Sequence, residues 1–253
     1  ELHALLRCAE RAAPSEPELA RGCLRELFAR EGYAFGALER SAALRALPGR
    51  AELVRRARAR ARESLEVLVD PPAGEPAGTL IWLHGAFDRP EPHQTWLRRD
   101  LPGAARFKLV LPRGALRKAF EGLEAGLPAA ELALDLLSEG QPGPVYLGGV
   151  SLGAEAAYAV AIRRPERFAG VLSLEGSYSP DLGRLARARG ALRVALLHGR
   201  SSWSADDARA ALRRLERAGV PARLGWYTGG HHVRASAVRE ELRAAWGWLR
   251  AGP

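Results

Sequence analysis

The sequence lacks the features of several large classes of protein. Its 253 residues include no methionine, only two cysteines and no apolar run near the ~18 residues that are needed to cross a membrane. No cluster of cysteine and histidine has the spacing of metal ligands, and no stretch is typical of a nucleotide, flavin or pyridoxal site. We therefore expect a soluble protein with no integral membrane segment, no metal and no cofactor, and we favour a cytoplasmic location over a secreted one.

Lysine is nearly absent, although the chain is strongly basic. The formal net charge is +9 and the isoelectric point is near 10.4, yet Lys108 and Lys118 are the only lysines. Asparagine is missing and isoleucine occurs twice, a bias typical of a GC-rich genome. The densest arginine group, residues 55–62, has no interleaved aromatic residues and matches no RNA- or DNA-binding module. We expect a solvated helix face there and no nucleic-acid partner.

Residues 149–153 form the most informative motif of the chain. They read Gly-Val-Ser-Leu-Gly and follow the apolar residues 145–147. This G-x-S-x-G pattern predicts a sharp turn between a buried strand and a helix, which holds Ser151 in a strained conformation and exposes its oxygen as a nucleophile. The helix begins at Leu152 in this interpretation, so its free backbone N–H groups can stabilise an oxyanion.

A second motif lies upstream, where the apolar residues 79–83 are followed directly by His84 and Gly85. The loop that follows a strand ending in His-Gly typically supplies the second donor to the oxyanion. That donor is usually the backbone N–H just after the glycine, here the N–H of Ala86. We expect His84 to shape the loop through hydrogen bonds to the backbone, not to transfer protons.

The third motif places a histidine beyond a late strand. Gly229 and Gly230 precede His231 and His232, and the first of these histidines lies 80 residues after the serine. We favour His231 as the residue that accepts the serine proton, because it follows the glycine pair directly. His232 is the alternative, and otherwise it lines the pocket or lies behind it.

These motifs together resemble the α/β-hydrolase superfamily, and within it the phospholipase/carboxylesterase and dienelactone-hydrolase-like branch. The resemblance covers about three quarters of the chain and rests on five segments in the family's order, namely residues 83–85, 149–153, 168–174, 194–199 and 230–231. The chain order of serine, then acid, then histidine is also that of the family. The resemblance implies an α/β fold, a mostly parallel sheet with helices on both faces, and hydrolase activity without a cofactor.

The sequence departs from that branch at the catalytic acid. The aspartate usually lies three residues beyond the second His-Gly, where this chain has Ser202. Glu175 ends the preceding strand at a place where relatives often have a serine, and it resembles the acid of the pancreatic-type lipases. Asp206 or Asp207 is the alternative, although both also fit the first turn of a helix that Ser204 caps. A chain without an effective acid is the third interpretation. We favour Glu175.

The chain divides into a helical N-terminal extension, residues 1–62, and an α/β-hydrolase domain, residues 63–253. A capping box at residues 15–18 predicts a helix that runs to Arg30. The extension either covers the active site as a cap or pads the flank of the sheet, and we favour the second and expect it to pack on the core. Cys8 and Cys23 either bridge two adjacent helices or are two buried free thiols.

Alternating strand and helix patterns from residue 64 onward predict the parallel sheet and bring the active groups to the carboxyl ends of its strands. Strands are predicted at residues 65–69, 79–83, 108–111, 145–147, 170–174, 194–197 and 222–226. Helices are predicted at residues 37–47, 51–62, 123–138, 205–218 and 233–249, besides the one that begins at Leu152.

The motifs therefore predict a serine hydrolase that cleaves carboxylic esters with a small or medium acyl group. Ser151, His231 and Glu175 form the expected triad, and an acyl-enzyme is the expected intermediate. The backbone N–H groups of Ala86 and Leu152 are the expected oxyanion donors. Peptidase, thioesterase or acyltransferase activity on the same triad is one alternative, and a non-catalytic binding protein with this fold is another. The expected partner is a small-molecule ester, and the sequence does not specify the oligomeric state.

Overall fold

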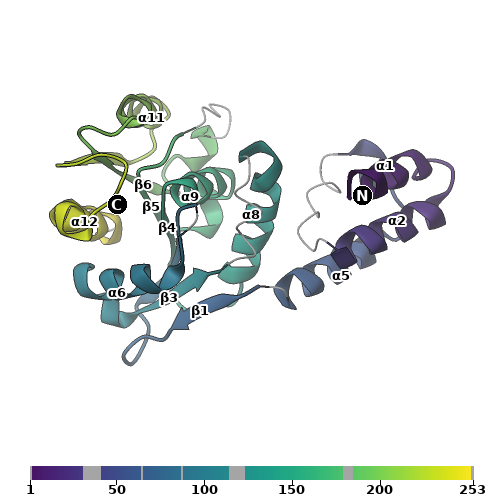
Figure 1. Ribbon diagram of the computed structural model, residues 1–253, viewed down its shortest axis with the longest axis horizontal. Coiled ribbons are helices and arrows are strands. Elements are labelled where there is room, and N and C mark those ends of the chain that lie inside the picture. Colours follow the sequence, from purple (N-terminus) through teal and green to yellow (C-terminus); the bar gives the residue numbers. More distant parts are fainter. Residues whose placement is uncertain are drawn as a thin grey trace.

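A seven-stranded sheet forms the centre of the protein, for which a computed structural model describes residues 2–30, 41–63, 65–86, 88–113, 123–178 and 185–251 (Figure 1). The strand order is β1-β3-β2-β4-β5-β6-β7, with β1 antiparallel to β3 and every other neighbouring pair parallel. The strands are β1 (Val67–Asp70), β2 (Gly78–Leu83), β3 (Phe107–Pro112), β4 (Val145–Val150), β5 (Gly170–Leu174), β6 (Arg193–Gly199) and β7 (Ala222–Tyr227). The predicted mostly parallel sheet is confirmed.

Helices cover both faces of this sheet. One face carries α8 (Leu123–Ser138), α9 (Leu152–Arg163) and α11 (Ala205–Arg217). The other face carries α6 (Pro90–Asp100) and α12 (Ala235–Arg250). Along β2, Ile81 and Leu83 pack against the first group and Leu80 and Trp82 against the second, because successive side chains of a strand point to opposite faces. All residues of β2 are buried, as expected of a parallel strand that is covered on both sides.

The predicted strands and the predicted helices of this part of the chain are present, with bounds that differ by a few residues. The sequence patterns do not predict α6. This helix begins at Pro90. Proline is compatible with the first turn of a helix, because backbone N–H groups there make no hydrogen bond within the helix. Short 3-10 helices lie at η1 (Ala104–Arg106), η2 (Pro165–Arg167) and η3 (Ala186–Ala188). None of the described helices has the length and apolar character to cross a bilayer.

The N-terminal residues form a separate group of helices, which lies to one side of the sheet in Figure 1. These helices are α1 (Leu2–Ala12), α2 (Pro17–Arg30), α4 (Ala42–Arg45) and α5 (Arg50–Glu63). They share their own apolar core, which includes Leu24, Leu27, Leu44 and Leu53. The predicted helix at residues 37–47 is described only as α4, and residues 37–40 lie outside the described residues.

The end of α5 joins this group to the α/β part of the chain. Ala61 packs with Leu136 of α8, and Arg58 and Arg62 form ion pairs with Glu139 just beyond α8. These contacts are made with α8, one of the helices that cover the sheet, and with the residue just beyond it. The domain boundary between residues 62 and 63 stays a prediction.

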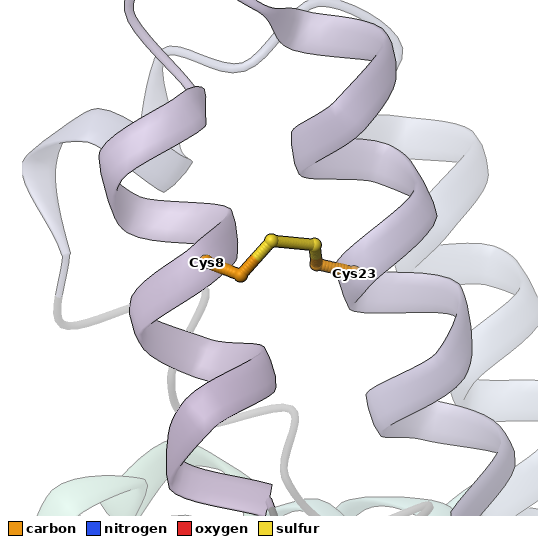
Figure 2. Close-up of a disulfide and its surroundings, with 2 residues drawn as sticks. All are labelled: Cys8 and Cys23. Carbon is orange, nitrogen blue, oxygen red and sulfur yellow. A yellow bond between two sulfur atoms is a disulfide. The ribbon is translucent and has the colours of Figure 1, made fainter.

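Cys8 of α1 and Cys23 of α2 form a disulfide (Figure 2). Their Cα atoms are 6.2 Å apart, and 15 residues separate them in the sequence. Of the two alternatives for the cysteines, the bridge between adjacent helices is therefore the one observed. A cross-link of this kind stabilises a fold mainly by restricting the unfolded chain.

Candidate active site

Ser151 occupies the sharp turn between β4 and α9. Its φ is 54° and its ψ is −125°, a conformation that a residue other than glycine rarely adopts. A Cβ atom added at Gly153 would lie 2.4 Å from the carbonyl oxygen of Leu83, and one added at Gly149 would lie 2.6 Å from the carbonyl carbon of Gly153. Both glycines are therefore required by close backbone contacts, as the motif predicts.

The loop between β7 and α12 brings His231 to this serine. Nε2 of His231 lies 3.0 Å from Oγ of Ser151, within hydrogen-bond distance. The carbonyl oxygen of Gly229 accepts a hydrogen bond of 2.9 Å from the backbone N–H of Ser201, which ties this loop to the end of β6. His232 is exposed, and its ring centroid lies 6.5 Å from that of His231. The favoured histidine is the one that contacts the serine.

Glu175 lies directly after β5 and is fully buried. Its Oε2 is 3.5 Å from Nδ1 of His231, which is an ion-pair distance but longer than a direct hydrogen bond. Asp206 and Asp207 lie instead on the exposed first turn of α11, where the 95% exposed side chain of Asp206 pairs with Arg209. Of the candidate acids, Glu175 is the one that the fold brings beside His231.

Three donors hold the carboxylate of Glu175 in place. Oε1 accepts hydrogen bonds of 2.5 Å from the backbone N–H of Gly199 and from the hydroxyl of Tyr227. Oε2 accepts one of 2.5 Å from Oγ of Ser202. Burial, together with the hydrogen bond to Glu175, raises the pKa of Tyr227 above its usual value, so its hydroxyl stays protonated and donates. Such donors compensate for the loss of water around a buried carboxylate.

Leu152 follows Ser151 directly, and the residue before Ala86 lies beside Ser151. Leu152 is the first residue of α9, where backbone N–H groups have no partner within the helix. A Cβ atom added at Gly85 would lie 3.5 Å from Cβ of Ser151, and the exposed Ala86 is the next residue. His84 is buried and its Nδ1 donates a 2.8 Å hydrogen bond to the carbonyl oxygen of Gly85. This contact is of the loop-shaping kind expected of His84.

Solved structures match this architecture, whereas no family model and no curated protein sequence matches the chain. The esterase PE8 aligns with a TM-score of 0.57 at 22% identity, over 74% of this chain and 98% of its own. Acyl-protein thioesterase 2 of Zea mays aligns with a TM-score of 0.56 at 19% identity, over 74% of this chain and 98% of its own. A phospholipase/carboxylesterase from Dyadobacter fermentans aligns with a TM-score of 0.58 at 16% identity, over 72% and 96%.

The chain has the α/β-hydrolase fold. The predicted resemblance is therefore confirmed at the level of the fold, and the helical N-terminal extension lies in addition to it. The strand order places β4, β5, β6 and β7 next to one another, so the turns after these strands meet at one edge of the sheet. That edge is the place of the site.

Ser202 marks the point where this chain departs from the expected sequence pattern. Its hydroxyl donates to Glu175 and lies 3.1 Å from the hydroxyl of Ser204. A carboxylate at position 202 would place a second negative charge at the oxygen that Ser202 now contacts. The serine at 202 and the glutamate at 175 therefore form one compatible pair.

A neutral histidine lies behind the carboxylate. His198, near the end of β6, is fully buried, and its Nε2 lies 2.8 Å from the hydroxyl of Tyr178. Its Nδ1 lies 3.5 Å from Oγ of Ser204 and 3.8 Å from Oε2 of Glu175. Burial lowers the pKa of His198 to about 4, so it carries no charge near neutral pH. Glu175 therefore has no second imidazolium beside it to compete with His231.

Sequence reasoning missed a third buried histidine, His93, which anchors the loop that carries Ala86. Nδ1 of His93 in α6 accepts a 3.1 Å hydrogen bond from Nε1 of Trp82, so its proton is on Nε2, which lies 2.7 Å from Oδ2 of Asp88. Burial lowers the pKa of His93, which favours the neutral form that these two contacts need. The helix that carries His93 was not predicted, so its neighbours could not be inferred.

The described residues contain no group of three or more histidine, cysteine, aspartate or glutamate side chains arranged to bind a metal ion.

Proposed function

We propose that this chain is a serine hydrolase that cleaves carboxylic esters with a small or medium acyl group. The observation that carries the proposal is the 3.0 Å distance between Oγ of Ser151 and Nε2 of His231, at a turn whose backbone is held in a strained conformation. A nucleophile and a base at hydrogen-bond distance, with a carboxylate on the far side of the imidazole, are the parts that acyl transfer needs.

Acylation begins when Oγ of Ser151 attacks the ester carbonyl carbon and Nε2 of His231 takes the serine proton. The C–O bond to the alcohol then breaks, and the imidazolium returns the proton to the leaving alcohol oxygen. Glu175 orients His231 through Nδ1 and stabilises its charged form. Tyr227, Ser202 and the N–H of Gly199 keep that carboxylate in position.

The developing oxyanion is held by the backbone N–H groups of Ala86 and Leu152 in this proposal. Loss of one such donor costs about 3 kcal/mol of transition-state stabilisation in comparable sites. Water then attacks the acyl-enzyme with His231 as the base again, which releases the carboxylic acid and restores Ser151.

Structural neighbours support hydrolysis as the reaction. They include a protein named as an esterase, a phospholipase/carboxylesterase and a fluorophosphonate-binding serine hydrolase of Staphylococcus aureus. Acyl thioesters are the second candidate substrate, because an acyl-protein thioesterase is among the neighbours. Both substrates use the same nucleophile and the same intermediate.

A fluorophosphonate probe tests the proposal directly. We expect the folded wild-type protein to be labelled and Ser151→Ala to lose the label. Ser236→Ala is the matched control, since Ser236 is an exposed serine on α12 and should not affect labelling. An absence of labelling in folded wild-type protein would contradict the hydrolase and favour a non-catalytic binding protein.

Hydrolysis rates then distinguish the two substrates. We expect oxygen esters of acetate and butyrate to be cleaved, and Ser151→Ala to abolish that cleavage. Cleavage restricted to thioesters of the same acyl groups would overturn the ester assignment and leave the nucleophile in place.

A further inference from the structure

Trp203 is the most exposed large apolar side chain in the described part of the chain. It is 69% exposed and lies in the loop between β6 and α11. Its two neighbours in the sequence, Ser202 and Ser204, are both buried. Burial of an indole removes on the order of 200 Å² from water, so a tryptophan left outside forgoes a large stabilisation.

The loop backbone fixes Trp203 in this outward position. The backbone N–H of Ser202 donates to the carbonyl oxygen of Gly199 at 3.0 Å, and that of Ala205 donates to the carbonyl oxygen of Ser202 at 3.2 Å. The side chains of Ser202 and Ser204 are hydrogen bonded to each other and to the buried groups around Glu175. Because both flanking residues are held inside, the indole between them is held at the surface.

The indole lies against the histidine of the proposed triad. The ring centroids of Trp203 and His231 are 5.1 Å apart, and the two ring planes make an angle of 38°. Nε2 of His231 faces Ser151 and its Nδ1 faces Glu175, so the indole contacts the imidazole without competing for either nitrogen. The side chain of His231 is 24% exposed, which leaves this corner of the site open to solvent.

The chemistry of acyl transfer decides which part of a substrate meets this corner. Nε2 of His231 must hand its proton to the oxygen of the departing alcohol, so that oxygen lies on the histidine side of the tetrahedral carbon. The other three positions on that carbon hold Oγ of Ser151, the oxyanion, which faces the amide donors, and the acyl chain. Groups attached to the alcohol oxygen therefore extend past His231 toward the indole.

We propose that Trp203 forms the leaving-group subsite of this enzyme and selects esters of flat aromatic alcohols. An aromatic ring can stack on the exposed indole and remove its face from water, whereas a small alkyl group cannot reach it. The inference rests on the proposed function. It concerns acylation only, since the alcohol has left before water attacks the acyl-enzyme.

Acetates of three alcohols with similar intrinsic reactivity test the proposal: benzyl, cyclohexylmethyl and ethyl acetate. We expect Trp203→Ala to lower kcat/KM for benzyl acetate about five- to tenfold, which lies within the range that an aromatic pair supplies, and to change the value for ethyl acetate less than about twofold. Trp203→Phe keeps an aromatic face and should restore most of the benzyl rate. The three substrates share one acetyl-enzyme, so within each variant the rate of deacylation should be the same for all three.

Leu19→Ala is the matched control, because Leu19 is also an exposed apolar residue but lies on α2 in the N-terminal helices. An equal loss for all three acetates in Trp203→Ala would overturn the subsite, since it would mean that the indole only positions His231. A change in preference for acyl length at constant alcohol would assign Trp203 to the acyl chain and also overturn it. Equal losses for the benzyl and cyclohexylmethyl esters would overturn the aromatic preference.

Failure of this inference can be told apart from failure of the proposed function. If wild-type protein is labelled by the fluorophosphonate but does not hydrolyse benzyl esters, the nucleophile stands and the substrate assignment is wrong. If it is neither labelled nor active, both proposals are wrong.

Discussion

Replacement of Glu175 by glutamine is the most discriminating test of the proposed triad. Glutamine has nearly the same shape as glutamate, and its carbonyl oxygen can still accept from the N–H of Gly199 and the hydroxyl of Tyr227. Its NH₂ group then occupies the place of Oε2, 3.5 Å from Nδ1 of His231. A donor at that place makes Nδ1 an acceptor, so the imidazole proton moves to Nε2.

The tautomer determines the size of the effect. With a proton on Nε2, His231 cannot accept the proton of Ser151, 3.0 Å away. A triad with the wrong tautomer loses on the order of 10³- to 10⁴-fold in kcat, which corresponds to about 4–6 kcal/mol in the activation free energy. We expect a loss of this size for Glu175→Gln and an unchanged KM, because no contact of the substrate itself is removed.

Steady-state hydrolysis of one ester, measured on wild type and variants, checks the prediction. Asp206→Asn is the matched control: it also removes one carboxylate charge, but from a side chain that is 95% exposed and paired with Arg209, so we expect less than about a twofold change. Thermal unfolding must show that Glu175→Gln is folded. Retention of more than about a tenth of the activity in Glu175→Gln, or a larger loss in Asp206→Asn, would refute the assignment of the acid.

Two further predictions concern stability. Burial lowers the pKa of His198 from 6.5 to about 4, so the unfolded state binds a proton at this residue before the folded state does as the pH falls. The contribution of neutral His198 to the free energy of unfolding is fully present above pH 6.5. The free energy of unfolding should decrease by about 3 kcal/mol as the pH falls from 6.5 toward 4. Urea unfolding at a series of pH values should show this slope in wild type and in His232→Gln but a reduced slope in His198→Gln, and equal slopes in all three would contradict the reasoning. For the disulfide, Cys8→Ser with Cys23→Ser should destabilise the N-terminal helices by about 3 kcal/mol, as expected for a loop of 15 residues. Limited proteolysis should detect the loss while ester hydrolysis stays unchanged, and a parallel loss of activity would mean that these helices support the site.

Local patterns in the sequence predicted much of the fold. Five buried strands read as short apolar runs, and the helix after Ser151 read as a run of strong helix formers, so their positions were predicted within a few residues. The G-x-S-x-G turn was also predictable, because Gly149 and Gly153 are required by contacts within a few residues of the turn and with the neighbouring β2. By contrast, α6 was not predicted, because prolines that open a helix look the same in sequence as prolines that end one.

Contacts between distant residues were harder to foresee. The sequence favoured Glu175 as the acid but left Asp206, Asp207 or the absence of an effective acid as alternatives. Only the folded chain brings one of them, Glu175, to within 3.5 Å of Nδ1 of His231. Likewise only the folded chain brings the exposed ring of Trp203 against His231.

The sequence by itself determined the alternation of strands and helices, the class of fold and the identity of the serine that the sharp turn exposes, because each depends on residues that are close together in the chain. The tertiary structure alone decided which carboxylate faces the histidine and which aromatic ring borders the site. Those relations join the ends of β4, β5, β6 and β7, and they exist only once these strands lie side by side in one sheet.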